Sequence, residues 1–173
     1  MRLASILLGT LIATTVTLVR ADEPPTQGPP AIELRADGLK QAKNEGKRVF
    51  LVFGSSGCGW CKIFENYHSD PEVARVLGKY LVFVKVSIDE NPGGDKLYLE
   101  YGKQRGVPAF SILDSDGKVL ADSGDQDKNI GFPFQPQEIE QYFTALAAAC
   151  PALSASEVVI LRDKLNEVRP RKE

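Results

Sequence analysis

The sequence has no excess of positive charge and no basic cluster interleaved with aromatic residues. Its 21 Lys and Arg residues are offset by 23 Asp and Glu residues, which leaves a formal net charge of −2. Because proteins that bind DNA or RNA usually present a basic face, we expect no nucleic acid among the partners. No internal repeat is present either. A chain of 173 residues with 43% hydrophobic composition is long enough for one domain whose core needs no disulfide staples.

Cysteine and histidine are both scarce, with three Cys residues and one His. Cys58 and Cys61 are spaced as a pair, which leaves Cys150 over. Haem attachment would require His directly after the second cysteine, and Lys62 at that position excludes it. A structural disulfide remains an alternative, as does a Cys3His zinc site made of Cys58, Cys61, Cys150 and His68. The second pair of those ligands lacks finger-like spacing, so we expect no metal and no cofactor.

The first 31 residues differ in kind from the rest. Arg2, the apolar run over residues 3–13 and the small residue Ala21 are typical of a secretory signal peptide, predicted over residues 1–21. We therefore expect export to the bacterial periplasm or secretion, where disulfides persist. An uncleaved signal peptide acting as an anchor is the alternative, and it is the one case in which the membrane is a partner. Residues 22–31 contain paired prolines and predict an extended linker.

Residues 32–150 alternate helical patterns with short apolar runs. Three runs of strand length, at residues 49–53, 81–88 and 107–113, predict strands buried in a sheet covered by helices. Helices are expected at residues 34–45, 62–67, 70–79, 95–101 and 136–149, with a hairpin turn at 114–117 leading into a strand at 118–121 and a polar loop at 122–135. The order predicts an α/β domain with a mixed sheet.

Residues 151–173 predict a helical extension with a charged tail. Ser154 and Glu157 have capping-box spacing, and Val158, Leu161, Leu165 and Val168 then form an apolar stripe. We expect this stripe to pack on the domain, and a helix that binds a partner is the alternative.

The Cys58-Gly59-Trp60-Cys61 motif follows a buried strand and a Gly/Ser loop and opens a helix. Free backbone N–H groups and the helix dipole favour a thiolate at the first cysteine. Cys58 could then attack a partner disulfide, and Cys61 could resolve the mixed disulfide. Trp60 offers an apolar surface to a protein substrate.

The chain resembles the thioredoxin superfamily over about residues 34–149. The resemblance rests on the strand at 49–53, the 58–62 motif, the strand and turn at 85–93, the Gly-Val-Pro-Ala-Phe segment at 106–110 and the hairpin at 116–119. It implies the thioredoxin fold, a central mixed β-sheet flanked by helices, here with an extra C-terminal helix. It also implies that Pro108 is a cis proline beside the cysteines and that the Val107 backbone faces a substrate groove.

Two positions depart from the thioredoxin pattern. Val52 stands where many thioredoxins carry a buried acid, although Lys85, the lysine associated with that acid, is retained. Glu65, one turn after Cys61, could replace the acid if it pointed inward. Gly57 stands where a tryptophan often precedes the first cysteine.

Together these features predict a monomeric thiol-disulfide oxidoreductase that acts on exported protein disulfides as a reductase, with an unidentified redox partner. A disulfide oxidase or isomerase, or a non-enzymatic redox-sensing binding module, are the alternatives. We expect His68 to be a surface or capping residue. Cys150 is expected to be a small buried side chain or an idle thiol, and pairing between two chains is the other possibility.

Overall fold

The computed structural model describes residues 27–102, 106–125 and 128–170. The signal peptide predicted over residues 1–21 lies outside these ranges, as do residues 22–26 of the predicted linker. Within the described ranges, no helix has the length and apolar character needed to cross a membrane.

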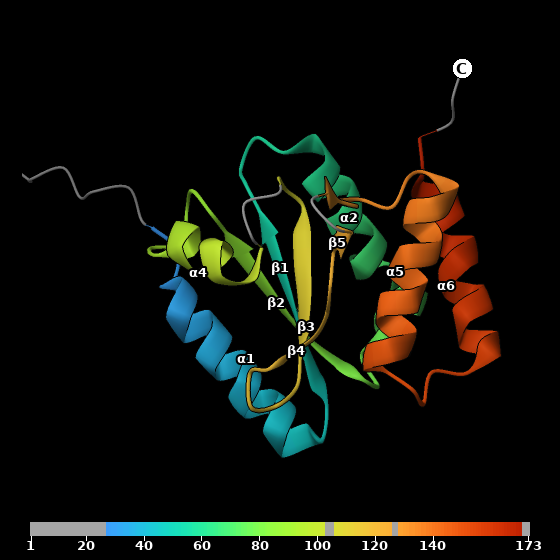
Figure 1. The fold of residues 1–173 in the computed structure, drawn as a ribbon, viewed down its shortest axis with the longest axis horizontal. Helices are drawn as coiled ribbons and strands as arrows, with labels where there is room; N and C mark the ends of the chain where they lie inside the picture. Colours follow the sequence, from blue (N-terminus) through green and yellow to red (C-terminus); the bar gives the residue numbers. More distant parts are fainter. Residues whose placement is uncertain (1–26, 103–105, 126–127, 171–173) are drawn as a thin grey trace, which may run out of the picture.

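A four-stranded mixed sheet forms the centre of the molecule (Figure 1). Its strands lie in the order β2-β1-β3-β4, with β1 parallel to β2 and the other neighbours antiparallel. The strands are β1 (Arg48–Gly54), β2 (Leu81–Ser87), β3 (Ala109–Leu113) and β4 (Val119–Asp122). The continuous apolar run at the centre therefore is a strand buried on both faces, as predicted.

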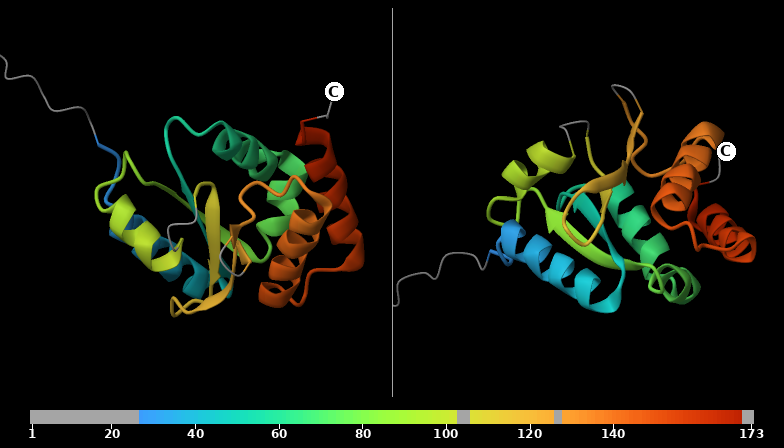
Figure 2. Two further views of the ribbon diagram at one scale, coloured as in Figure 1. Left: turned by 45° about the horizontal axis from the view of Figure 1, so that its top comes forward. Right: turned by 60° about the horizontal axis from the view of Figure 1, so that its bottom comes forward.

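Helices cover both faces of the sheet (Figures 1 and 2). One face packs against α1 (Ala31–Glu45) and α4 (Gly94–Tyr101), and the other against α2 (Gly59–Ser69), α3 (Pro71–Leu77), α5 (Pro136–Ala149) and α6 (Ala155–Val168). The alternation of side chains along β1 separates the two cores. Leu51 and Phe53 face the α1 side, whereas Phe50 faces the α2 side. This arrangement is the predicted thioredoxin fold.

Two of the helices begin at residues whose side chains cap the helix N-terminus. The Asp70 carboxylate accepts hydrogen bonds from the backbone N–H groups of Glu72 (2.8 Å) and Val73 (3.3 Å), so it caps α3 as predicted. Ser154 and Glu157 form the predicted capping box of α6.

The first helix begins three residues earlier in the sequence than predicted. Helix α1 begins at Ala31 rather than Leu34, because Ala31 is buried and its N–H donates to the Pro92 carbonyl oxygen (2.9 Å). The Asn91 side chain donates to the Pro29 carbonyl oxygen (2.9 Å). The last residues of the proline-rich segment therefore contact the loop between β2 and α4.

The segment predicted as a polar loop over residues 122–135 contains two short strands. They are β5 (Gly124–Asp125) and β6 (Lys128–Asn129), which pair antiparallel. Strands of two residues carry no detectable periodicity, which is why the sequence pattern indicated a loop.

Helix α6 packs on the domain, as predicted. Leu161 and Leu165 are fully buried, and the Tyr67 hydroxyl donates to the Leu161 carbonyl oxygen (3.1 Å). The ion pair between Lys79 and Glu157 (2.7 Å) ties the start of α6 to the residues after α3.

Candidate active site

Cys58 and Cys61 form a disulfide at the N-terminus of α2. Cys58 is the N-cap residue of the helix, and its Sγ accepts a hydrogen bond from the backbone N–H of Cys61 (3.1 Å). Both residues are half-buried. When the pair is reduced, the same N–H and the positive end of the helix dipole face the Cys58 sulfur, which favours its thiolate.

The Val107–Pro108 peptide bond is cis, as predicted, and Val107 lies next to Cys58. The Val107 carbonyl oxygen lies 3.7 Å from the Cys58 Sγ. Asn129, on β6, donates from its side-chain amide to the carbonyl oxygens of Gly106 (3.0 Å) and Pro108 (2.8 Å). The small β5–β6 hairpin therefore anchors the segment that faces the Cys58 sulfur.

Trp60 carries the largest exposed apolar surface of the motif, with 46% of its area accessible. Its ring stacks on Phe132, with centroids 5.6 Å apart and planes 20° apart, and lies 5.8 Å from the Phe134 ring at 59°. We did not single out these two phenylalanines from the sequence. The Phe-Pro-Phe pattern at residues 132–134, within a segment predicted as a polar loop, is the sequence feature that could have indicated them.

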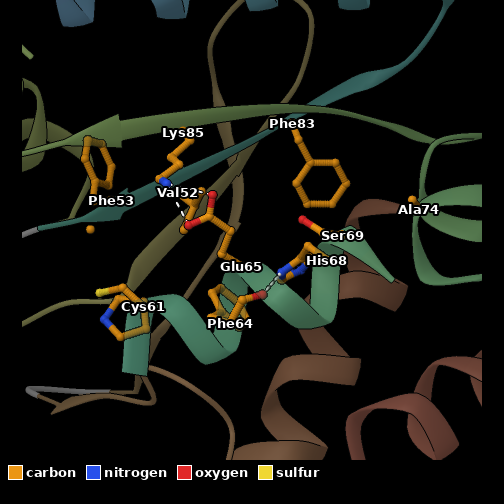
Figure 3. A pocket seen from close by; sticks show the side chains of 12 residues that line it. Val52, Phe53, Cys61, Phe64, Glu65, His68, Ser69, Ala74, Phe83 and Lys85 are labelled. Atoms are coloured by element: carbon orange, nitrogen blue, oxygen red, sulfur yellow. Dashed lines mark hydrogen bonds and ion pairs between the residues drawn. The ribbon is translucent and has the colours of Figure 1, made fainter. Parts of the chain in front are cut away.

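A cavity of about 360 Å³ opens between α2 and the exposed edge of β2 (Figure 3). Its lining is mainly apolar and comprises Val52, Phe53, Gly54, Cys61, Phe64, Glu65, His68, Ser69, Ala74, Phe83, Lys85 and Pro108. Cys61 therefore shares this cavity with Val52, which stands at the position of the thioredoxin acid, and with Glu65, the alternative acid.

The ion pair in this cavity differs from the one that the resemblance implies. Val52 supplies no carboxylate, and the Lys85 ammonium instead contacts both Glu65 carboxylate oxygens, at 2.7 and 2.6 Å (Figure 3). Glu65 is exposed and reaches the cavity from α2, one turn after Cys61. Among the described residues that line the cavity, Glu65 is the one acid.

His68 is half-buried among aromatic side chains, whereas we expected a surface or capping residue. Its ring packs against Phe50, Phe64 and Phe83, with centroids 5.1, 4.3 and 4.9 Å away. The Nδ1 atom lies 2.8 Å from the Phe64 carbonyl oxygen, which can only accept, so Nδ1 carries the proton and Nε2 accepts from the Tyr142 hydroxyl (3.0 Å). Burial lowers the pKa of His68 to about 4. Polar neighbours in the sequence misled the prediction, because His68 lies one turn after Phe64 on the buried face.

Cys150 is buried, with 2% of its area exposed, and it is not in a disulfide. This residue is therefore a small core side chain, as expected, and its burial raises the pKa of the thiol to about 11. Both ring nitrogens of His68 are engaged, by the Phe64 carbonyl oxygen and the Tyr142 hydroxyl. Over the described ranges, no group of three or more His, Cys, Asp or Glu side chains is arranged to hold a metal ion.

Asp89 anchors the loop that precedes Cys58. Its carboxylate accepts from the hydroxyls of Ser87 (2.6 Å) and Ser56 (2.7 Å) and from the Ser56 backbone N–H (3.1 Å). These hydrogen bonds, with Ser87 contributing most, lower the pKa of Asp89 to about 2. Nothing in the sequence pattern indicated this contact between two loops.

We expect the Asp89→Asn variant to lose a pH-dependent part of the stability. The folded pKa of about 2 lies below the unfolded value of 3.8, so the ionised carboxylate stabilises the fold above pH 3.8, and this contribution disappears as pH falls through about 2. Urea unfolding should therefore show the variant less stable than the wild type at about pH 5, with the gap closing toward about pH 2. Asp37→Asn, at an exposed position of α1, is the control. A gap that stays constant with pH would contradict the role of the charge.

The fold and the disulfide at the start of α2 define a thioredoxin-like protein. Residues 31–123 match the family described as Thioredox_DsbH, protein of unknown function, DUF255, and the chain belongs to that family.

Among curated proteins, the chain is similar to the thiol:disulfide interchange protein DsbD of Photorhabdus laumondii. The two are 38% identical over 82 residues, which cover 47% of this chain and 14% of that protein. Human spermatogenesis-associated protein 20 is 35% identical over 66 residues, 38% of this chain and 8% of that protein. The chain thus matches only a small part of these longer relatives.

Two solved structures show the same fold. A disulphide isomerase from Xylella fastidiosa Temecula1 has a TM-score of 0.51 at 18% identity, covering 89% of this chain and 98% of that one. A DsbH oxidoreductase has a TM-score of 0.50 at 21% identity, covering 79% and 95%. At these identities the comparisons establish the fold and leave the reaction to be argued from the site.

Proposed function

We propose that this protein is a dithiol–disulfide oxidoreductase that reduces disulfides in exported proteins, with Cys58 as nucleophile and Cys61 as resolving thiol. The observation that carries the proposal is the disulfide at the N-terminus of α2, with the Val107 carbonyl oxygen 3.7 Å from the outer sulfur. A structural disulfide would gain little here, because a bridge that closes so short a loop removes little chain entropy from the unfolded state.

The reaction proceeds through two exchanges of sulfur–sulfur bonds. The Cys58 thiolate attacks one sulfur of the partner disulfide, which forms a mixed disulfide and releases the partner's other sulfur as a thiolate. The Cys61 thiolate then attacks the Cys58 sulfur, which forms the Cys58–Cys61 disulfide and releases the second partner thiolate. Both partner thiolates take up protons. Two electrons pass to the partner, and a separate dithiol donor must return them.

The second exchange requires Cys61 to lose its proton. Glu65 is the one acid among the described residues that line the cavity reaching Cys61, and Lys85 holds its carboxylate there. We assign to Glu65 the proton-accepting role that Val52 cannot perform. The carboxylate does not point inward, as direct replacement of the buried acid would require, and it is exposed. The proposed transfer therefore passes through water between the two groups.

Trp60, Val107 and Pro108 are the proposed contacts for the protein substrate. The Val107 backbone faces the Cys58 sulfur and offers an extended segment a strand-like partner. Action in the periplasm or outside the cell is part of the proposal. The predicted signal peptide supports it, as does the similarity to an interchange protein named DsbD.

Reduction of insulin-type protein disulfides by the purified protein, with dithiothreitol as the electron donor, tests the function. We expect turnover well above the rate with dithiothreitol alone, unchanged in Cys150→Ser. Glu65→Gln should turn over more slowly and accumulate mixed disulfide. Wild-type protein that only binds disulfide-containing proteins, without turnover, would favour the redox-sensing binding module instead.

A further inference from the structure

Helix α6 is connected to Trp60 of the motif through the contact between Arg169 and Phe134. Arg169, the residue that caps the end of α6, donates from Nη2 to the Phe134 carbonyl oxygen (2.7 Å). Its guanidinium lies 5.6 Å from the centroid of the Phe134 ring, and Nη1 donates to the Asn166 side chain (2.8 Å). These contacts fix both the backbone and the ring of Phe134.

Phe134 in turn helps to hold Trp60 in place. The Trp60 ring lies 5.8 Å from Phe134 and stacks on Phe132 at 5.6 Å. Phe132 is 4% exposed and meets the core residue Phe64 edge to face at 6.3 Å. One side of the indole is therefore bound to the protein, while 46% of the residue stays exposed. Trp60 is a rigid apolar surface two residues from Cys58.

We propose that Trp60, supported by Phe134 and Arg169, selects partner disulfides that carry a bulky apolar side chain next to the attacked cysteine. The inference rests on the proposed function and deepens it by naming the substrate class. Trp60 is the specificity-determining residue, and Phe134 and Arg169 are positioning residues. The helix beyond the common thioredoxin core is then part of substrate selection as well as of the fold.

The surroundings of Cys58 favour an apolar occupant. A partner segment that reaches the sulfur passes between the Val107 backbone on one side and the motif helix with Trp60 on the other. Trp60 adds a 46% exposed aromatic ring to this wall, and such a ring favours contact with aliphatic or aromatic groups. The Arg169 cation nearby is already engaged with Phe134 and Asn166.

Arg162 provides a matched control on the same helix. Its guanidinium lies 4.3 Å from the centroid of the Phe143 ring and binds both carboxylate oxygens of Glu140, at 2.6 and 2.8 Å. It helps α6 to pack on α5, as Arg169 does on the loop before α5, but it contacts Phe143 and Glu140 and not Phe134. Arg162→Met therefore perturbs the helix without acting on Trp60.

The experiment compares two disulfide-linked peptides that differ only in the residue next to cysteine, Phe in one and Gly in the other. We expect the wild-type protein to favour the Phe peptide about 10-fold in kcat/KM, through KM, which corresponds to about 1.4 kcal/mol of contact with the indole. Trp60→Ala should abolish the preference. Arg169→Met and Phe134→Leu should each reduce it severalfold and shift the fluorescence of Trp60, the only tryptophan, whereas Arg162→Met should change neither.

Several results would overturn the inference. Equal turnover of both peptides by the wild type would contradict the selection while leaving the proposed function intact. An Arg169→Met variant with unchanged preference, or with both peptides slowed equally and the Trp60 emission unaltered, would show that Arg169 serves only the fold. Failure of the wild type to turn over either peptide would contradict the proposed function itself.

Discussion

Cys58→Ser is expected to abolish disulfide exchange, because a serine hydroxyl at this position cannot replace a thiolate as nucleophile toward sulfur. Cys58 is the proposed nucleophile, since it caps α2 and lies next to the Val107 carbonyl oxygen. Insulin reduction by the variant should fall to the rate of the chemical reductant alone. Unchanged turnover would contradict the role of Cys58.

Cys61→Ser is expected to trap the reaction halfway. Cys58 can still attack a partner disulfide, but no second sulfur remains to release the product, so mixed disulfides accumulate. Non-reducing gels followed by mass spectrometry should show adducts linked through Cys58, and these should disappear on reduction. Cys150→Ser is the matched control, since Cys150 is buried and outside the pair. Adducts that persist in a Cys58→Ser/Cys61→Ser double variant would show that the trapping does not pass through the motif.

Phe50→Ala should lower the free energy of unfolding by about 3–5 kcal/mol, the usual cost of removing a buried phenylalanine. Phe50 is fully buried at the centre of β1. Its ring lies about 5 Å from those of Phe110, Phe83 and His68, so several elements lose contacts at once. Denaturant unfolding monitored by circular dichroism measures the change.

The control for this substitution is Val159→Ala on α6. Val159 is 55% exposed, so removing two methyl groups there should change the stability by less than about 0.5 kcal/mol. A loss of less than about 1 kcal/mol for Phe50→Ala would mean that the core around β1 is packed less tightly than the structure shows.

Much of the fold follows from short-range patterns in the sequence. The apolar run through Phe50 and Phe53 predicted a strand buried on both faces, because each face of β1 meets a different helical layer. Asp70 and Ser154 marked helix starts correctly, since a cap depends on residues within one turn. Cys58 and Cys61 were recognisable because their chemistry requires neighbouring positions at a helix start.

The supporting contacts of the site were not predictable in this way. Asn129 holds the Gly106–Pro108 segment across 21 residues, Asp89 holds Ser56 across 33, and Arg169 holds Phe134 across 35. Each depends on how loops far apart in the sequence meet after folding, and a single polar residue in a loop carries no periodic signal. Val52 indicated from the sequence that the buried acid of thioredoxins is replaced in this chain. The pairing of Lys85 with Glu65 instead is seen only in the structure.

The measurement that tests the central claim most directly is the reduction potential of the Cys58–Cys61 couple. It should be determined in the mature domain carrying Cys150→Ser, equilibrated against dithiothreitol or glutathione. A value near about −270 mV, as in thioredoxin, is the result we predict, because such a dithiol donates electrons to exported disulfides. A value near about −120 mV, as in the strongly oxidising DsbA, would contradict the reductase and indicate a protein that installs disulfides.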